Sequence, residues 1–163
     1  MSETELIDAP KPDATKLVKT VARHALIEDV CFGMTDSVQR LCSFDTQTDE
    51  GLAREITLDN PTDFKATETD GLVLNIVHWL AGRRTLPDPK TGEMRDGPFL
   101  AFELDDGSTW GTGSAGCVRS WAKIVASKGR GPYKPPLRVM VKHLELSGKR
   151  NYFILLPVSG LPQ

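Results

Sequence analysis

Aromatic rings and cationic side chains, the groups that can hold a polyanion, gather in the second half of this 163-residue sequence. Residues 71–163 contain 13 Lys and Arg against 7 Asp and Glu, a net charge of +6, and residues 1–70 contain 7 against 15, a net charge of −8. The two halves together give the −2 of the whole chain, and eight of the eleven aromatic residues fall in the second half. Rings stack on bases and cations follow phosphates, so nucleic acid is the first ligand to consider.

Four aromatic residues are candidates for stacking on bases, and each has a structural alternative. Trp110 is the first choice, because its Ser, Thr and Gly neighbours are expected to leave the ring face accessible; the alternative is a ring folded over the end of the core. Tyr133 lies in a proline-flanked loop, where it is expected to form a groove wall or else to pack against the loop. Trp79 and Tyr152 are weaker candidates, because each lies in an apolar strand where a ring more often joins the core.

Seven cationic residues are expected to contact phosphates. They follow the first expected strand, flank the proline-rich loop, share one face of the fourth strand or lie in the last turn: Arg83, Arg84, Lys134, Arg138, Lys142, Lys149 and Arg150. A single charge at a strand edge or turn often serves only solubility. The net charge of +6 in one half of the chain nevertheless favours an arrangement in which at least half of these side chains line one groove.

The sequence from Gly111 to Gly116 matches G-x-G-x-x-G, the pattern of a dinucleotide-binding turn. That site also needs an acidic residue about 20 positions further on, at the end of a parallel strand. Residues 131–136 are Gly-Pro-Tyr-Lys-Pro-Pro, so we interpret the glycines as a tight turn before a helix and expect no cofactor. The alternative is that amides at the start of the helix accept a phosphate.

Patterns typical of catalysis or metal binding do not occur in the sequence. His24, His78 and His143 lack HxH or HExxH spacing, and no pair of carboxylates accompanies them. The three cysteines lack CxxC spacing and are expected to be buried free thiols in a reducing compartment. We therefore expect a protein that is not an enzyme and holds no metal ion.

The second half predicts five strands and one helix in the order of an oligonucleotide/oligosaccharide-binding (OB) barrel. Apolar alternation predicts the strands, and a 3.6-residue period predicts the helix between the third and fourth strands. The expected ranges are 72–80, 98–107 and 108–114 for three strands, 117–129 for the helix, and 137–146 and 151–158 for two more strands. Residues 81–97 are expected to form a polar connection rich in turn residues. The predicted fold class is mostly β (α+β), a five-stranded OB barrel with a small acidic N-terminal extension.

The first half predicts less structure. Residues 1–14 are expected to form a flexible acidic arm, and residues 15–70 an acidic helical or mixed extension of the 71–163 OB domain. Within the extension we expect a helix from residue 15 to Gly33, a short helix from Asp36 to near Phe44, and a weak strand over Arg54–Leu58.

Two stretches, FELDDGSTWGTGS (102–114) and PLRVMVKHLELSGKRNYFILLPV (136–158), separated by a helix, resemble the single-stranded DNA-binding proteins of tailed phages and some plasmids. The resemblance covers the second half of the chain. It implies an OB fold that coats single strands during replication or recombination in a host cytoplasm. Many such proteins end in an acidic tail that recruits partners, whereas this sequence ends VSGLPQ and has its acidic excess in the first half.

The leading hypothesis is therefore a non-catalytic protein that binds single-stranded DNA by stacking and phosphate contacts. The alternative is an OB-like interaction module or regulatory subunit of a replication or transcription assembly, docking through the acidic first half. A third hypothesis has the acidic half fold over the basic groove and compete with DNA. The sequence shows neither a secretory leader nor an apolar run of membrane-spanning length, so we expect a cytoplasmic location without membrane partners. Oligomeric state stays open.

Overall fold

The computed structural model describes residues 27–33, 40–61, 63–88, 90–146 and 150–158, and the expected arm of residues 1–14 lies outside them. Residues 27–31 form a helical turn. The other elements follow in chain order: β1 (Arg40–Cys42), α3 (Asp49–Asp59), β2 (Phe64–Lys65), a 3₁₀ turn η1 (Ala66–Glu68), β3 (Val73–Pro87), β4 (Met94–Leu104), β5 (Thr109–Thr112), α4 (Ala115–Lys128), β6 (Leu137–Leu146) and β7 (Arg150–Pro157).

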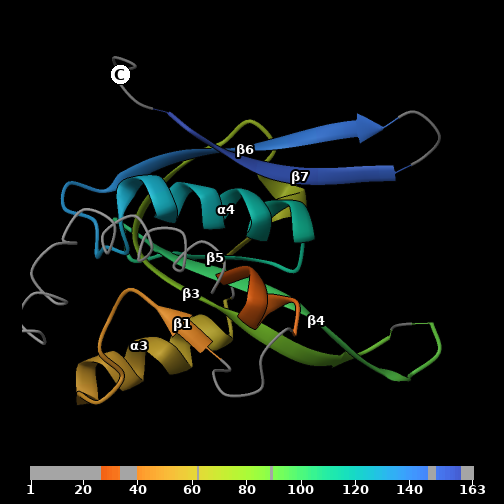
Figure 1. Cartoon of the computed structure of the whole chain (residues 1–163), viewed down its shortest axis with the longest axis horizontal. Helices are drawn as coiled ribbons and strands as arrows, with labels where there is room; N and C mark the ends of the chain where they lie inside the picture. Colours follow the sequence, from red (N-terminus) through yellow and green to blue (C-terminus); the bar gives the residue numbers. More distant parts are fainter. Residues whose placement is uncertain (1–26, 34–39, 62, 89, 147–149, 159–163) are drawn as a thin grey trace, which may run out of the picture.

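The seven strands form one curled sheet, so the fold is mostly β with few helices, as the sequence predicts. The strand order is β2-β5-β4-β3-β6-β7, and β1 pairs with β3. β2 runs parallel to β5 and the other pairs are antiparallel, so the sheet is mixed. The sheet curls into a half-barrel, and α4 lies between the β6–β7 hairpin and strands β3 and β4 (Figure 1). Among the described strands no ladder joins β5 to β7, so the half-barrel stays open there.

β3 pairs with a strand on each side of the half-barrel. Its first residues, Val73–Ile76, pair with β6, and the rest of the strand pairs with β4. The register with β4 shifts between Ile76 and His78, where the carbonyl of Val77 accepts the backbone N–H of Tyr133 at 3.0 Å. An extra residue in a ladder bends its strand, so this position lets β3 turn from one neighbour to the other.

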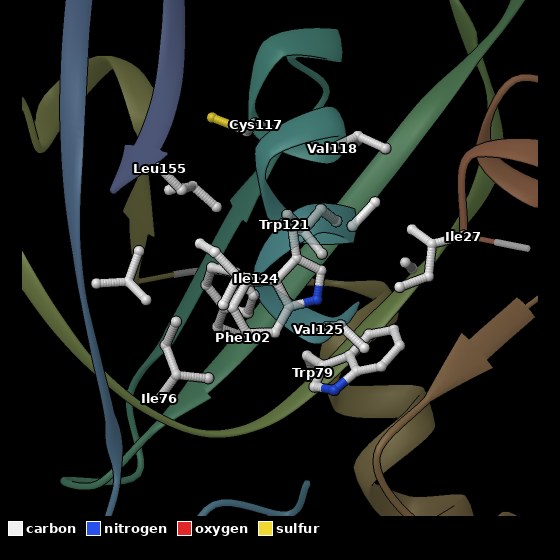
Figure 2. Close-up of a cluster of buried hydrophobic side chains, with 14 of the residues drawn as sticks. Ile27, Ile76, Trp79, Phe102, Cys117, Val118, Trp121, Ile124, Val125 and Leu155 are labelled. Atoms are coloured by element: carbon white, nitrogen blue, oxygen red, sulfur yellow. The ribbon is translucent and has the colours of Figure 1, made fainter. Parts of the chain in front are cut away.

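α4 begins and ends where the sequence indicates. The hydroxyl of Ser114 accepts the N–H of Cys117 at 3.4 Å as the N-cap, and Gly129 ends the helix with a φ of +91°, which favours glycine. The apolar face of the helix is buried in the half-barrel. Figure 2 shows Trp121 pointing into the cluster that contains Trp79 and Phe102.

Strands β3 and β4 carry a core on each face, because successive side chains of a strand point to opposite sides. On the α4 side, Trp79, Leu100 and Phe102 join the larger cluster with the buried face of α4. On the other side, Leu80 and Ala101 pack with residues of β1 and α3. α3 and α4 therefore lie on opposite faces of these two strands (Figure 1).

Two predictions in the first half are wrong. Arg54–Leu58 is helical, as part of α3, because Thr48 caps that helix by accepting the N–H of Gly51 at 3.0 Å, and Asp49 and Glu50 occupy its first turn. Of the short helix expected from Asp36 to near Phe44, residues 40–42 form strand β1, which pairs with β3 through the register Leu41 with Ala81, and residues 36–39 lie outside the described residues. The helix expected from residue 15 lies outside the described residues except for the turn at 27–31.

The described part of the expected extension shares the sheet and the core with residues 71–163. β1 pairs with β3, and β2 pairs with β5. Ile27, Leu41 and Ala66 are buried in the larger cluster, and Leu58 of α3 is buried in the smaller one.

The stretch expected to be a polar connection, residues 81–97, is largely an extension of β3 and β4 into a long hairpin. Cross-strand polar contacts hold it: Arg83 donates to Asp96 at 3.2 Å, and the hydroxyl of Thr85 donates to the same carboxylate. None of the helices described by the structure is long and apolar enough to cross a membrane.

Candidate nucleic-acid interface

The side chain of Trp110 points into the core. It is 0% exposed, its indole N–H donates to Thr69 Oγ1 at 2.9 Å, and its ring stacks on Phe102 with the centroids 5.0 Å apart. The small neighbours do not leave the ring open, because other segments of the chain cover them: Pro61 lies against Gly111. The prediction that Trp110 presents an accessible face is wrong.

Two further aromatic candidates are also buried. Trp79 donates its indole N–H to the carbonyl of Arg130 at 2.8 Å and packs edge-on against Trp121. Tyr133 is 8% exposed, and its hydroxyl donates to the carbonyl of Gly129 at 2.6 Å. Burial raises the pKa of Tyr133 to about 12. Neither ring offers a face to a base. Trp79 packs in the core and Tyr133 packs against its own loop, which are the structural alternatives given for these two residues.

Lys134 and Arg138 lie with Tyr133 around a hollow of about 610 Å³. We call it the proline-loop hollow and define it by residues 131–138 with Lys128, Pro157 and Val158. The described residues that line it include no carboxylate.

Tyr152 lies in a different place, a groove of about 1000 Å³ between α4 and β7. We call this the helix groove and define it by Arg119, Lys123, Ile124, Lys128, Tyr152, Ile154, Leu156 and Pro157. Lys128 and Pro157 also line the proline-loop hollow, so the two depressions adjoin.

The remaining predicted cations are dispersed. Arg83 pairs with Asp96 on the β3–β4 hairpin, and Arg84 on the same strand lies over the ring of Phe99, 4.1 Å from its centroid. Lys142 is exposed on β6, where its register partner is Ile154 of β7. Lys149 and the side chain of Arg150 lie outside what the structure describes.

A third depression, of about 780 Å³, lies beside β5. We call it the β5 hollow and define it by Phe64, Lys65, Arg84, Asp88, Arg95, Asp96, Phe99, Gly111, Thr112, Gly113, Ser114 and Phe153. Phe64 is 38% exposed and pairs in register with Trp110 across the β2–β5 ladder. The ring of Phe64 is therefore accessible at the edge of the sheet where the sequence predicts an accessible Trp110. Sequence reasoning missed Phe64 and Lys65, because two residues between turn formers carry no periodic signal.

The β5 hollow carries three cations and two carboxylates. Arg95 pairs with Asp88 at 3.1 Å, and Asp96 pairs with Arg83 from outside the hollow. Within the described residues, Lys65 and Arg84 form no ion pair. Burial lowers the pKa of Arg84 from its ordinary value, although a guanidinium stays protonated at neutral pH. Two cations are therefore available to an anionic ligand beside the exposed ring of Phe64.

The glycine-rich corner has a packing explanation. A Cβ on Gly111 would lie 2.4 Å from a side-chain carbon of Pro61, and a Cβ on Gly116 would lie 2.4 Å from the carbonyl oxygen of Phe153. Both distances are below any normal contact, so these positions need glycine for the close approach of Pro61, in the segment before β2, and of β7. This agrees with our interpretation of the motif as a turn and helix start.

Ser43 and His78 form the kind of pair that nucleophilic enzymes use, with Ser43 Oγ 3.2 Å from His78 Nδ1. The serine is buried and its oxygen also accepts the backbone N–H of Trp79 at 3.0 Å, so the pair fastens the end of β1 to β3. Burial lowers the pKa of His78. In the described ranges, no group of three or more His, Cys, Asp or Glu side chains could hold a metal ion.

The structure thus places some of the predicted residues in three separate depressions and others in the core, whereas Arg83 and Lys142 lie in none of these. Comparison with protein-family models, curated proteins and solved structures finds no match for this chain.

Proposed function

We propose that this chain is a non-catalytic single-stranded DNA-binding protein that coats DNA with little sequence specificity during replication or recombination, as the proteins of tailed phages and plasmids do. The strand order supports an OB-type fold. With β3, β4, β5, β6 and β7 taken as strands one to five, the sheet runs 3-2-1-4-5 and α4 follows strand three. An OB barrel is partly open and binds oligonucleotides on strands two and three and on the loops after strands one and four.

The observation that carries the proposal is the composition of the β5 hollow. Its walls include strands two and three of the OB order, β4 and β5, and the β3–β4 hairpin that follows strand one. The accessible ring of Phe64 lies there beside the cations Lys65 and Arg84. A ring with nearby cations is the combination that holds a single strand, because a base stacks on the ring while its phosphates are neutralised.

Two contributions to the binding free energy, base stacking and phosphate contacts, can be measured separately. Stacking contributes about 1–3 kcal/mol per base and accepts any base. Each phosphate contact on a single strand adds about 0.7 to the slope of affinity against salt.

The test is fluorescence anisotropy of a labelled oligo-dT at several salt concentrations, with duplex DNA and RNA as competitors. A labelled oligonucleotide is the better reporter because all three tryptophans are buried. We expect Phe64→Ala to weaken binding about 5- to 150-fold, the equivalent of one lost stacking contact. We expect Lys65→Ala to lower the salt slope by about 0.7.

Lys134→Ala is the matched control, because Lys134 is an exposed lysine of the separate proline-loop hollow. It should leave both affinity and slope unchanged. Absence of binding at low salt would contradict the proposed function. Binding that Lys134→Ala weakens and Phe64→Ala does not would move the site to the proline-loop hollow.

A second candidate function is a protein-interaction module, and α3 is the observation that favours it. This acidic helix exposes the apolar side chains of Leu52 and Ile56 to solvent. Clustered apolar side chains on a charged surface are typical of a docking site. An oligo-dT titration without binding would leave this candidate as the better supported one.

A further inference from the structure

The exposed face of α3 has the composition of an anchor helix. Leu52 is 46% exposed and Ile56 is 59% exposed, one helical turn apart. Helical spacing places Asp49 and Glu55 beside this pair, and Asp59, which pairs with Arg40 of β1, lies at its end. Apolar anchors at positions i and i+4 within a charged ring are what a helix presents to an apolar groove.

The helix groove has the complementary composition. Its apolar residues include Ile124 of α4 and Ile154 and Leu156 of β7. Lys123 and Lys128 supply positive charge, Arg119 pairs with Glu28 at 4.0 Å, and the described residues that line the groove include no carboxylate.

The groove and the helix also match in length. α4 has 14 residues and is therefore about 21 Å long, whereas α3 has 11 residues and is about 16 Å long. α3 can lie along the groove within the extent of α4.

We propose that copies of this chain associate head to tail, with α3 of one copy seated in the helix groove of the next. α3 and α4 lie on opposite faces of β3 and β4, so α3 does not reach the groove of its own chain (Figure 1). In a symmetric contact between two helix grooves, Lys123 and Lys128 would face like charges and repel them. In a symmetric contact between two α3 helices, carboxylates would face carboxylates with the same result. The complementary pairing is α3 with groove.

A contact between two different surfaces leaves one of each free after every addition, so it builds open chains or rings. On a single strand of DNA such a chain would place successive β5 hollows along the strand and make coating cooperative, a consequence that rests on the proposed function. The association itself requires no DNA.

The test is sedimentation velocity of the full chain without nucleic acid, over a wide range of protein concentrations at low salt. Wild-type protein is expected to grow in mean mass beyond a dimer. Ile56→Asp removes an anchor and Lys123→Glu opposes the acidic helix, so each variant alone should weaken association about tenfold or more.

A mixture of these two variants is the decisive sample. Ile56→Asp keeps an intact groove and Lys123→Glu keeps an intact α3, so the mixture should form a 1:1 complex that does not grow further. Met94→Asp, at an exposed apolar residue of β4, is the control that should associate like wild type, and circular dichroism checks that each variant is folded. A monomeric wild type, association that neither variant reduces, or a wild type that stops at a dimer would overturn the proposal.

Discussion

Trp110 shows why the size of sequence neighbours is a poor guide to exposure. A buried indole needs an acceptor for its N–H, and Thr69 supplies one from the segment before β3. The glycine that follows Trp110 leaves room that Pro61 fills, so the small residues serve close packing. The exposed ring at the same edge is Phe64, contributed by the first half of the chain.

The tight packing at the glycine-rich corner predicts the effect of a single substitution. Gly116→Ala places a Cβ 2.4 Å from the carbonyl oxygen of Phe153, and neither the helix start nor β7 can yield without loss of packing. We expect the free energy of unfolding to fall by about 1–3 kcal/mol, as for other overpacked sites, in urea titrations followed by circular dichroism.

Gly113→Ala is the matched control within the same motif. The nearest atom to its Cβ would be the carbonyl oxygen of Pro98 at 3.5 Å, an ordinary contact. Equal losses of stability for the two substitutions would contradict the packing explanation.

At the scale of elements, the second half could be predicted because its signals are local. β6 alternates strictly, and α4 has a Ser114 cap, a helical apolar face and a Gly129 stop, so their bounds follow from the sequence within a few residues. The long β3–β4 hairpin could not be predicted from its polar residues, because pairing between the two strands holds them extended. The candidate site was equally hard to predict, since Phe64 reaches the β5 edge only through the long-range β2–β5 pairing.

The sequence predicts a weak strand over Arg54–Leu58 between turn-forming residues, and Ile56 and Thr57 in that stretch are β-branched residues, which favour strands. The capping signal at Thr48 outweighs them. We expect Thr48→Ala to lower the free energy of unfolding by about 1 kcal/mol, the usual cost of a lost N-cap.

Thr67→Ala is the control for that substitution, since Thr67 is exposed within η1 and does not cap a helix. Urea titration measures both variants. A loss no larger for Thr48→Ala than for Thr67→Ala would show that the cap does not determine the helix.

At the scale of the whole molecule, the acidic first half is not a detachable cover over a basic groove in the part that the structure describes. Deleting residues 1–70 would remove β1, β2 and α3 together with core side chains such as Leu41 and Leu58. The hypothesis that acidic residues compete with DNA can therefore be tested only by truncations that stop before Ile27.

We expect buried thiols to limit the stability of the whole fold at alkaline pH. Burial raises the pKa of Cys31 to about 12 and that of Cys117 to about 11, from an ordinary value of 9.0. Above pH 9 the unfolded chain releases these protons while the folded chain keeps them, so the unfolded state binds fewer protons and is favoured as pH rises. Stability that is complete below pH 9 should be lost toward pH 11–12, at up to about 1.4 kcal/mol per pH unit for each thiol.

The measurement is the free energy of unfolding from urea titrations between neutral pH and pH 11, for wild type and for the double variant Cys31→Ala, Cys117→Ala. The double variant is less stable at neutral pH because two buried side chains are shortened, but its alkaline slope should be shallower, since alanine has no proton to lose. Some slope should persist, because burial also raises the pKa of Cys42 and of Tyr133. Parallel curves for the two proteins would show that core thiols do not govern the alkaline transition and that the limit lies with other groups.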